Sequence, residues 1–334
     1  MITIGNTWLW AGFGVFVVLA LIVDFVVLKK SGAHRVGMRE AAIWSVVWVA
    51  LSLVFAALLW WWLASRFGRE VADARTLEFV TGYLIEKSLA IDNIFLFLTI
   101  FTYFALPSEF QKRALMIGIV AAIVLRALLI VAGSYLIEQF HWVLYLFGAF
   151  LVITGIKMWW SAGKESSLDD NPVLRLLRRV LRVSPDYDGE RLFTRHDGVR
   201  MATPMLLVVA LIGIIDVIFA VDSIPAIFAI TDDPFIVLTS NIFAVLGLRA
   251  MFFLLADMAD RFHLLPYGLA VILLFVGSKM LIADVLHIPP LISLLVILGI
   301  LAVTIFLSVR HRPKTMAQAT AQAAAQPLLE DRTQ

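Results

Sequence analysis

The chain contains no cysteine and few charged residues. None of its 334 residues is Cys, and only 16% of them are Asp, Glu, Lys or Arg. The absence of cysteine excludes disulfide frameworks, cysteine nucleophiles and thiolate metal sites. A soluble domain usually has about 25% charged residues, so this chain has too little polar surface to cover a globule in water. Its net charge of +2 is too small to argue for binding to nucleic acid.

Apolar residues, in contrast, are abundant and continuous. They make up 61% of the chain, and the mean hydropathy is +0.93. A helix needs about 20 apolar residues to span a bilayer. Nine stretches qualify, at residues 8–28, 41–64, 78–104, 113–133, 141–160, 203–231, 236–257, 264–282 and 288–309. The sequence therefore predicts an all-α polytopic membrane protein with about nine transmembrane helices in the lipid bilayer.

The distribution of basic residues predicts the orientation of these helices. With the amino terminus outside, the segments on the cytoplasmic side hold nineteen Lys and Arg residues, whereas the external segments hold only Arg66, Arg69 and Arg75. Basic loops remain in the cytoplasm, so we expect the amino terminus outside and the carboxyl terminus inside. In the long loop 161–202, residues 172–183 have helical apolar spacing. This pattern suits an ordinary positive-inside loop or a helix on the membrane surface.

An internal repeat is the most informative feature of the sequence. Glu86 and Asp92 in the third stretch correspond to Asp216 and Asp222 in the sixth, with five residues between the two acids in each copy. Two further matches follow in the same order: Leu125-Arg126-Ala127 with Leu248-Arg249-Ala250, and Gly155-Ile-Lys157-Met158 with Gly277-Ser-Lys279-Met280. Each copy holds three spans, so the second copy is inverted relative to the first. A 3+3 inverted repeat is typical of secondary transporters.

The repeat divides the chain into units. The predicted units are two N-terminal helices in 1–64, a first repeat in 78–160, a cytoplasmic loop in 161–202, a second repeat in 203–282, a ninth helix in 288–309 and a disordered cytoplasmic tail in 310–334.

Acidic residues inside the spans are the candidate functional residues. Each charge near the bilayer centre costs on the order of 3 kcal/mol or more, so these acids need internal ion pairs or a bound cation. The predicted ligands are Glu86, Asp92, Asn93, Asp216, Asp222 and Ser223. Carboxylate, amide and hydroxyl oxygens suit hard divalent cations such as Mn²⁺, Mg²⁺ and Ca²⁺. A proton relay through the same carboxylates stays open.

Local geometry and other charges add expectations about this site. Two side chains six residues apart on a straight helix lie about 120° apart, so we expect the third and sixth spans to be broken beside the acids, with Pro225 as one cause. Arg126 and Arg249 would neutralise the site when the cation leaves, although ion pairing that only fixes helix packing is the competing interpretation. Asp24 and Lys87 are further supporting candidates, and an interfacial salt bridge is an equal alternative for Asp24.

Three segments resemble signatures of the TerC/Alx family of bacterial integral membrane proteins. They are residues 82–93 (GYLIEKSLAIDN), 216–226 (DVIFAVDSIPA) and 239–251 (TSNIFAVLGLRAM). The resemblance covers nearly the whole chain and is closest to the pH-regulated Alx branch. It implies manganese export across the bacterial cytoplasmic membrane, or links to tellurium resistance or to metal supply for secreted enzymes. It implies the same six ligands, with Asn241 as a weaker candidate. Close relatives carry Glu at the position of Gly213, which leaves the metal preference of this chain open.

The leading hypothesis is a Mn²⁺ exporter that works by alternating access, with no resident cofactor and with possible coupling to protons. Two alternatives remain: an exporter of another divalent cation such as Ca²⁺ or a general metal and tellurite stress protein, and a scaffold that transports nothing and docks partners through loop 161–202. An enzyme is not expected, because the sequence contains no nucleophile–base pair, phosphate-binding loop or His-containing metal motif.

Overall fold

The computed structural model describes residues 3–31, 37–140, 142–161, 172–196, 199–256, 264–286 and 288–310. Some side chains within these ranges, including those of Asp92 and Asp222, are outside the description, as is the predicted tail beyond Arg310. The elements are α1 (Thr7–Ser31), α2 (Met38–Phe67), α3 (Arg69–Tyr103), α4 (Ser108–Gln139), α5 (Val143–Ser161), α6 (Pro172–Val180), β1 (Phe193–His196), β2 (Val199–Ala202), α7 (Pro204–Phe228), α8 (Pro234–Leu246), α9 (Leu248–Ala256), α10 (Leu265–Leu281) and α11 (Pro290–Arg310).

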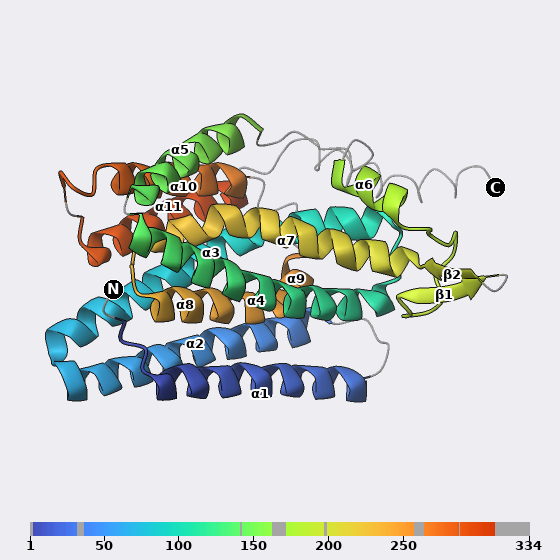
Figure 1. Cartoon of the computed structure of the whole chain (residues 1–334), viewed down its shortest axis with the longest axis horizontal. Helices are drawn as coiled ribbons and strands as arrows, with labels where there is room; N and C mark the ends of the chain where they lie inside the picture. The colour runs from blue at the N-terminus through green and yellow to red at the C-terminus, as the bar shows by residue number, and fades with distance from the viewer. Residues whose placement is uncertain are drawn as a thin grey trace, which may run out of the picture.

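The long helices lie side by side in one bundle, as an all-α polytopic membrane protein requires (Figure 1). Every predicted apolar stretch has a counterpart, with α8 and α9 together taking the place of the seventh. Within the described residues, six helices are long and apolar enough to span a membrane, and the bent pair α8 and α9 brings the total to seven. Helix α10 is not among them because it is shorter, with 17 residues. Helix α3 is long enough, but it contains several charged residues. The membrane fold is confirmed, whereas the count of nine stays a prediction.

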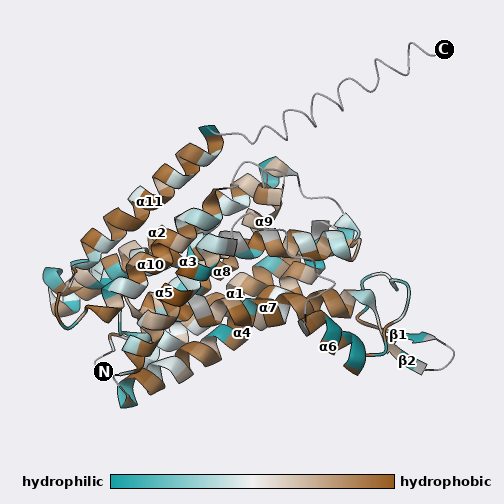
Figure 2. Cartoon of the chain, turned by 90° about the horizontal axis from the view of Figure 1, so that it is seen from above, coloured by the Kyte–Doolittle hydropathy of each residue, from teal (hydrophilic) through white to brown (hydrophobic). Residues whose placement is uncertain are grey.

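The burial pattern separates an inner from an outer set of helices. In α8 every residue from Phe235 to Leu246 is buried, which is typical of a helix that is apolar on all sides and lies in the interior. In α1, α2 and α11 most large apolar side chains are exposed, as lipid contact requires. Figure 2 shows hydrophobic residues along the bundle helices and hydrophilic ones gathered on α6.

The helix pairs follow the pattern that the predicted repeat requires. Helix α3 packs on α8, α4 packs on α7, and α5 packs on its counterpart α10. The last contact is made backbone to backbone: a Cβ added at Gly277 would lie 2.8 Å from the carbonyl oxygen of Gly148, and one added at Gly155 would lie 3.0 Å from that of Ala270. Exchange of the two copies converts one of these contacts into the other, because Gly155 matches Gly277 and Gly148 matches Ala270.

The predicted breaks beside the acids are wrong. Helices α3 and α7 are continuous through Glu86 and Asp216, and Pro225 lies only three residues before α7 ends at Phe228. A proline so close to the end removes one backbone hydrogen bond without interrupting the helix. The break occurs in the second repeat at Gly247 instead, where α8 and α9 meet at an angle of 41°.

The long loop contains more structure than the sequence predicts. Helix α6 covers most of the expected segment 172–183, and β1 and β2 form an antiparallel hairpin that we did not expect. Both lie at one end of the bundle, whereas the N-terminus lies at the other (Figure 1).

Candidate functional site

A buried arginine joins two of the predicted acidic residues. Arg126 extends from α4 and is 1% exposed. Its Nη1 donates to Oε1 of Glu86 on α3. Its Nε and Nη2 donate to the two carboxylate oxygens of Asp216 on α7, both at 2.9 Å. Three helices from both predicted repeats therefore meet at one guanidinium group.

Two carboxylates and one guanidinium give this cluster a net negative charge in the ionised state. Bidentate arginine–carboxylate pairs are strong and directional, and the buried carboxylates need such a partner because they have lost their water. Arg126 thus offsets part of the charge of the two carboxylates and joins α3, α4 and α7. Its role when a cation leaves stays a prediction. The two interpretations of Arg126 are both compatible with this geometry.

Further oxygen atoms surround the same guanidinium group. The hydroxyl of Ser223 and the amide oxygen of Asn241 each lie 3.5 Å from Nη1 of Arg126. Asn241 extends from α8, so the second repeat contributes to the cluster through two helices. Two polar atoms here, Oε2 of Glu86 and Nδ2 of Asn241, are buried without a hydrogen-bond partner. Buried polar atoms of this kind usually have a partner, so the site has capacity for a further ligand.

A small cavity lies against this cluster. Its volume is about 20 Å³, enough for one water molecule or a small ion. Polar atoms reach it from Glu86, Asn93, Arg126 and Ser223, and its apolar walls are Leu89, Met158, Phe219 and Leu273. These apolar residues could not be singled out from the sequence, because their periodicity is that of any buried helix face.

The structure thus brings Glu86, Asn93, Asp216 and Ser223 together with Arg126 and Asn241. Asp92 and Asp222 are in α3 and α7, but their side chains are outside the description. Among the residues that the structure describes, no three His, Cys, Asp or Glu side chains are close enough together to hold a metal ion. Gly213 lies one turn before Asp216, and a Cβ added there would meet nothing within 4 Å.

Arg249 does not join this cluster, contrary to the expectation from the repeat. It pairs instead with Asp24 of α1, and both side chains are largely buried. The bend between α8 and α9 provides the physical reason, because it changes the direction of the helix two residues before Arg249. The same pair gives Asp24 a partner on another helix, and the choice between an interfacial salt bridge and a supporting role stays open.

Lys87 has a role that the sequence did not predict. Its Nζ donates to the carbonyl oxygen of Ala244 at 3.3 Å, and a Cβ added at Gly247 would lie 2.5 Å from Nζ. The last carbonyls of a helix lack intrahelical partners and attract positive charge. Lys87 therefore caps α8 at the break. Gly247, a glycine inside an apolar stretch, was the feature of the sequence from which this break could have been predicted.

Comparisons with known proteins agree with this membrane architecture. The model of the integral membrane protein TerC family matches residues 71–316. The chain is 54% identical over 308 residues to an Escherichia coli (strain K12) protein named "Putative membrane-bound redox modulator Alx", covering 92% of this chain and 96% of that one. It is 47% identical over 320 residues to "Uncharacterized membrane protein STKORF319" of Myxococcus xanthus, covering 95% and 98%. No solved structure matches. The chain belongs to the TerC family of integral membrane proteins.

Proposed function

We propose that this protein is a secondary transporter that exports Mn²⁺ across the bacterial cytoplasmic membrane. The observation that carries the proposal is the convergence of Glu86 and Asp216, one acid from each predicted repeat, on a single buried point between α3, α4 and α7. Oxygen ligands at a repeat interface are what an alternating carrier of a hard cation needs.

In this proposal the guanidinium of Arg126 and the metal ion are alternative partners of the two carboxylates. With no ion bound, Arg126 compensates the charge that would otherwise be stranded in a low dielectric. An arriving dication displaces part of this pairing, and Asn93, Ser223 and Asn241 supply neutral oxygens. Asp92 and Asp222 complete the ligand set, as the motifs predict. Export against an inside-negative potential costs about 2.3 kcal/mol per charge per 100 mV, so we expect a coupling ion such as a proton.

The orientation belongs to the same proposal. Helix α6 and the hairpin, which are both part of the long basic loop 161–202, lie at the end of the bundle opposite the N-terminus. Basic loops remain in the cytoplasm, so we place the N-terminus outside and the C-terminus inside.

The Escherichia coli relative is named "Putative membrane-bound redox modulator Alx". This chain contains no cysteine, which limits the redox chemistry that its own side chains can perform. Thiol–disulfide exchange requires thiolates, so no such chemistry is open to it. A carrier of manganese, itself a redox-active metal, would influence redox balance indirectly.

The direct test measures cellular manganese in a strain that depends on this protein for export. Glu86→Gln, Asp92→Asn and Asp216→Asn should each raise manganese accumulation toward the level of cells without the protein. Asp24→Asn is a matched control, because it removes another intramembrane acid outside the cluster. Accumulation that is unchanged in the three variants, at equal protein levels, would contradict the proposal.

Two further measurements separate the alternatives. Uptake into proteoliposomes across a panel of Mn²⁺, Ca²⁺ and Mg²⁺ identifies the transported ion. The second measurement tests the scaffold. If function is lost when loop 161–202 is replaced but survives neutralisation of the four acids of the predicted ligand set, which are Glu86, Asp92, Asp216 and Asp222, the protein is a scaffold rather than a carrier.

A further inference from the structure

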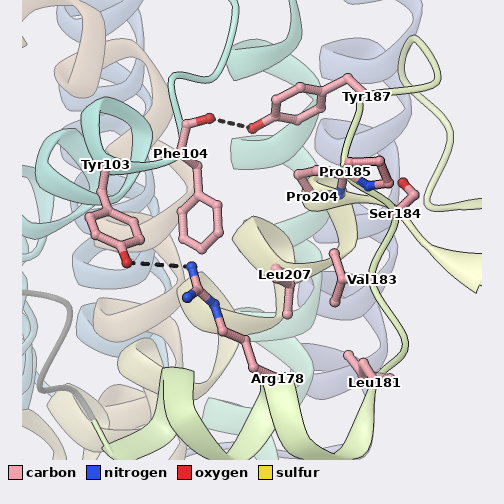
Figure 3. A pocket seen from close by; sticks show the side chains of 10 residues that line it. All are labelled: Tyr103, Phe104, Arg178, Leu181, Val183, Ser184, Pro185, Tyr187, Pro204 and Leu207. Carbon is pink, nitrogen blue, oxygen red and sulfur yellow. Dashed lines mark hydrogen bonds between the residues drawn. The ribbon is translucent and has the colours of Figure 1, made fainter.

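A second, much larger cavity lies at the end of the bundle that holds α6 and the hairpin. Its volume is about 580 Å³, and this open pocket is lined by the end of α3, the end of α6 with the chain that follows it, and the start of α7. Figure 3 shows the side chain of Arg178 pointing into this pocket toward Tyr103, beside the apolar side chains of Phe104 and Leu207. The pocket is therefore lined both by the charged guanidinium group of Arg178 and by apolar side chains.

Two tyrosine hydroxyls add polar groups to the pocket. Nη2 of Arg178 donates to the hydroxyl of Tyr103 at 3.4 Å, and the hydroxyl of Tyr187 donates to the carbonyl oxygen of Phe104 at 2.8 Å (Figure 3). Burial raises the pKa of Tyr187, so this phenol stays protonated at neutral pH. Within the described residues this long contact is the hydrogen bond that Arg178 makes, so most donors of its guanidinium can serve another partner.

The pocket lies at the predicted boundary between the bilayer and water. The apolar stretches that correspond to α3 and α7 run over 78–104 and 203–231, so Tyr103 and Pro204 mark the ends of two spans on the same side. This is the level of the lipid head groups, where tyrosine is enriched.

The outer surface of α6 combines positive charge with exposed apolar side chains. Arg175 and Arg179 are exposed beside Leu176 and Val180, which are 61% and 72% exposed, and α6 contains no acidic residue. No ion pair joins Arg175, Arg178 or Arg179 to any carboxylate in the described part of the chain. Such a helix is typical of a membrane interface with anionic lipid.

The adjacent hairpin adds further positive charge at the same end of the bundle. Arg195 and Arg200 lie directly opposite each other in β1 and β2. Like charges at directly opposed positions destabilise a strand pair, and the guanidinium of Arg200 lies over the ring of Phe193, 4.4 Å from its centroid. The nearby carboxylates of Glu190 and Asp188 are already engaged, by Arg113 and Arg191.

We propose that this pocket and the exposed face of α6 bind the phosphodiester head group of an anionic phospholipid. Arg178 holds the phosphate from within the pocket, Arg175 and Arg179 approach it from the helix surface, and Leu176 and Val180 contact the acyl chains. The seven basic residues of segment 172–202 other than histidine are all arginine, whose planar guanidinium matches phosphate better than lysine does. A soluble phosphate compound would leave the two exposed apolar side chains without a partner.

The test measures lipid binding to the purified full-length chain in detergent, by native mass spectrometry and by the shift of its thermal unfolding midpoint. The probes are phosphatidylglycerol and phosphatidylcholine. We expect the protein to retain phosphatidylglycerol, and Arg178→Gln to weaken this binding by about tenfold or more. Arg178→Lys should fall between the two. Arg69→Gln is the matched control, because Arg69 stacks over Trp60 at the opposite end of α3 and its loss should change nothing.

Three results would overturn the proposal. Equal binding of phosphatidylcholine and phosphatidylglycerol would remove the role of charge, and unchanged binding by Arg178→Gln would place the lipid elsewhere. Glycerol 3-phosphate that binds as tightly as phosphatidylglycerol would identify a soluble ligand instead. Because the readout is lipid binding, this proposal stands or fails separately from manganese transport.

Discussion

Arg126 holds Asp216 through two hydrogen bonds of 2.9 Å, from Nε to Oδ2 and from Nη2 to Oδ1. Through this pair, α4 of the first predicted repeat is fastened to α7 of the second. The third member, Glu86, is on α3 and shares the same guanidinium. The stability of the bundle and the proposed ion site therefore depend on the same three side chains.

Replacement of Arg126 by Met should destabilise the protein strongly. Two carboxylates would remain buried without a cation, and the loss of one partner from a buried ion pair costs about 3–5 kcal/mol. The midpoint of unfolding in detergent should fall accordingly. The triple variant Arg126→Met, Glu86→Gln, Asp216→Asn removes the stranded charges and should recover most of this stability. A triple variant as unstable as the single one would show that the ionic compensation is not the cause.

The two intramembrane ion pairs should behave as separate units. Asp216 and Arg126 share one cluster, whereas Asp24 and Arg249 form another with no residue in common. Asp24→Asn combined with Asp216→Asn should therefore change the free energy of unfolding by the sum of the single effects, within about 0.5 kcal/mol. Glu86→Gln combined with Asp216→Asn should deviate from additivity by about 0.5–3 kcal/mol. Additivity in the second pair would contradict the shared guanidinium.

The contact between α5 and α10 should not tolerate a side chain. A Cβ at Gly277 would lie 2.8 Å from the backbone oxygen of Gly148, which cannot rotate away. We expect Gly277→Leu to cost at least about 1–3 kcal/mol through overpacking, seen as a lower thermal unfolding midpoint. Gly299→Leu on α11 is the control, since a Cβ there meets nothing within 4 Å. Equal effects of the two substitutions would show that the close approach is unimportant.

Lys87 and Gly247 should be energetically coupled. Lys87→Met removes the donor that caps Ala244, which should cost about 1 kcal/mol. Gly247→Ala places a methyl group where Nζ lies and should displace the same contact. The double variant should therefore be less destabilised than the sum of the two single ones. Lys157→Met, at an exposed position of α5, should change unfolding by less than about 0.5 kcal/mol.

Much of the architecture could be predicted from the sequence. The length of an apolar stretch is set by the thickness of the bilayer, and basic loops indicate its cytoplasmic side. The acids Glu86 and Asp216 could also be paired from the sequence, since the repeat sets them at matching positions. The partner of Arg249 could not, because it depends on the 41° bend that Gly247 permits between α8 and α9. The repeat suggests equal roles for Arg126 and Arg249, but local geometry gives each a different partner.

The hairpin of β1 and β2 was not predicted, although the sequence contains signals for it. Its strands have four residues each and carry Arg195 and Arg200 at opposed positions. The sequence nevertheless contains two signals for a hairpin. Apolar and polar residues alternate from Val199 to Met201, and the pair Asp197-Gly198 between the two segments is typical of a two-residue hairpin turn.

Broken helices were expected to bring the two acids of each helix together, Glu86 with Asp92 and Asp216 with Asp222. Helices α3 and α7 are continuous instead. Glu86 and Asp216 meet across helices, at the guanidinium of Arg126 from α4.

The glycine contacts between α5 and α10 restrict how this protein can change shape. Side chains can adopt new rotamers when helices shift. Two backbones in direct contact cannot adjust in this way. In the proposed transport cycle, a rearrangement that opens a path to either side of the membrane should therefore move α5 and α10 together as one rigid unit. Helices α3, α4 and α7, which hold Glu86, Arg126 and Asp216, would then move relative to this rigid pair. The surface of α5 and α10 would set the direction of that movement.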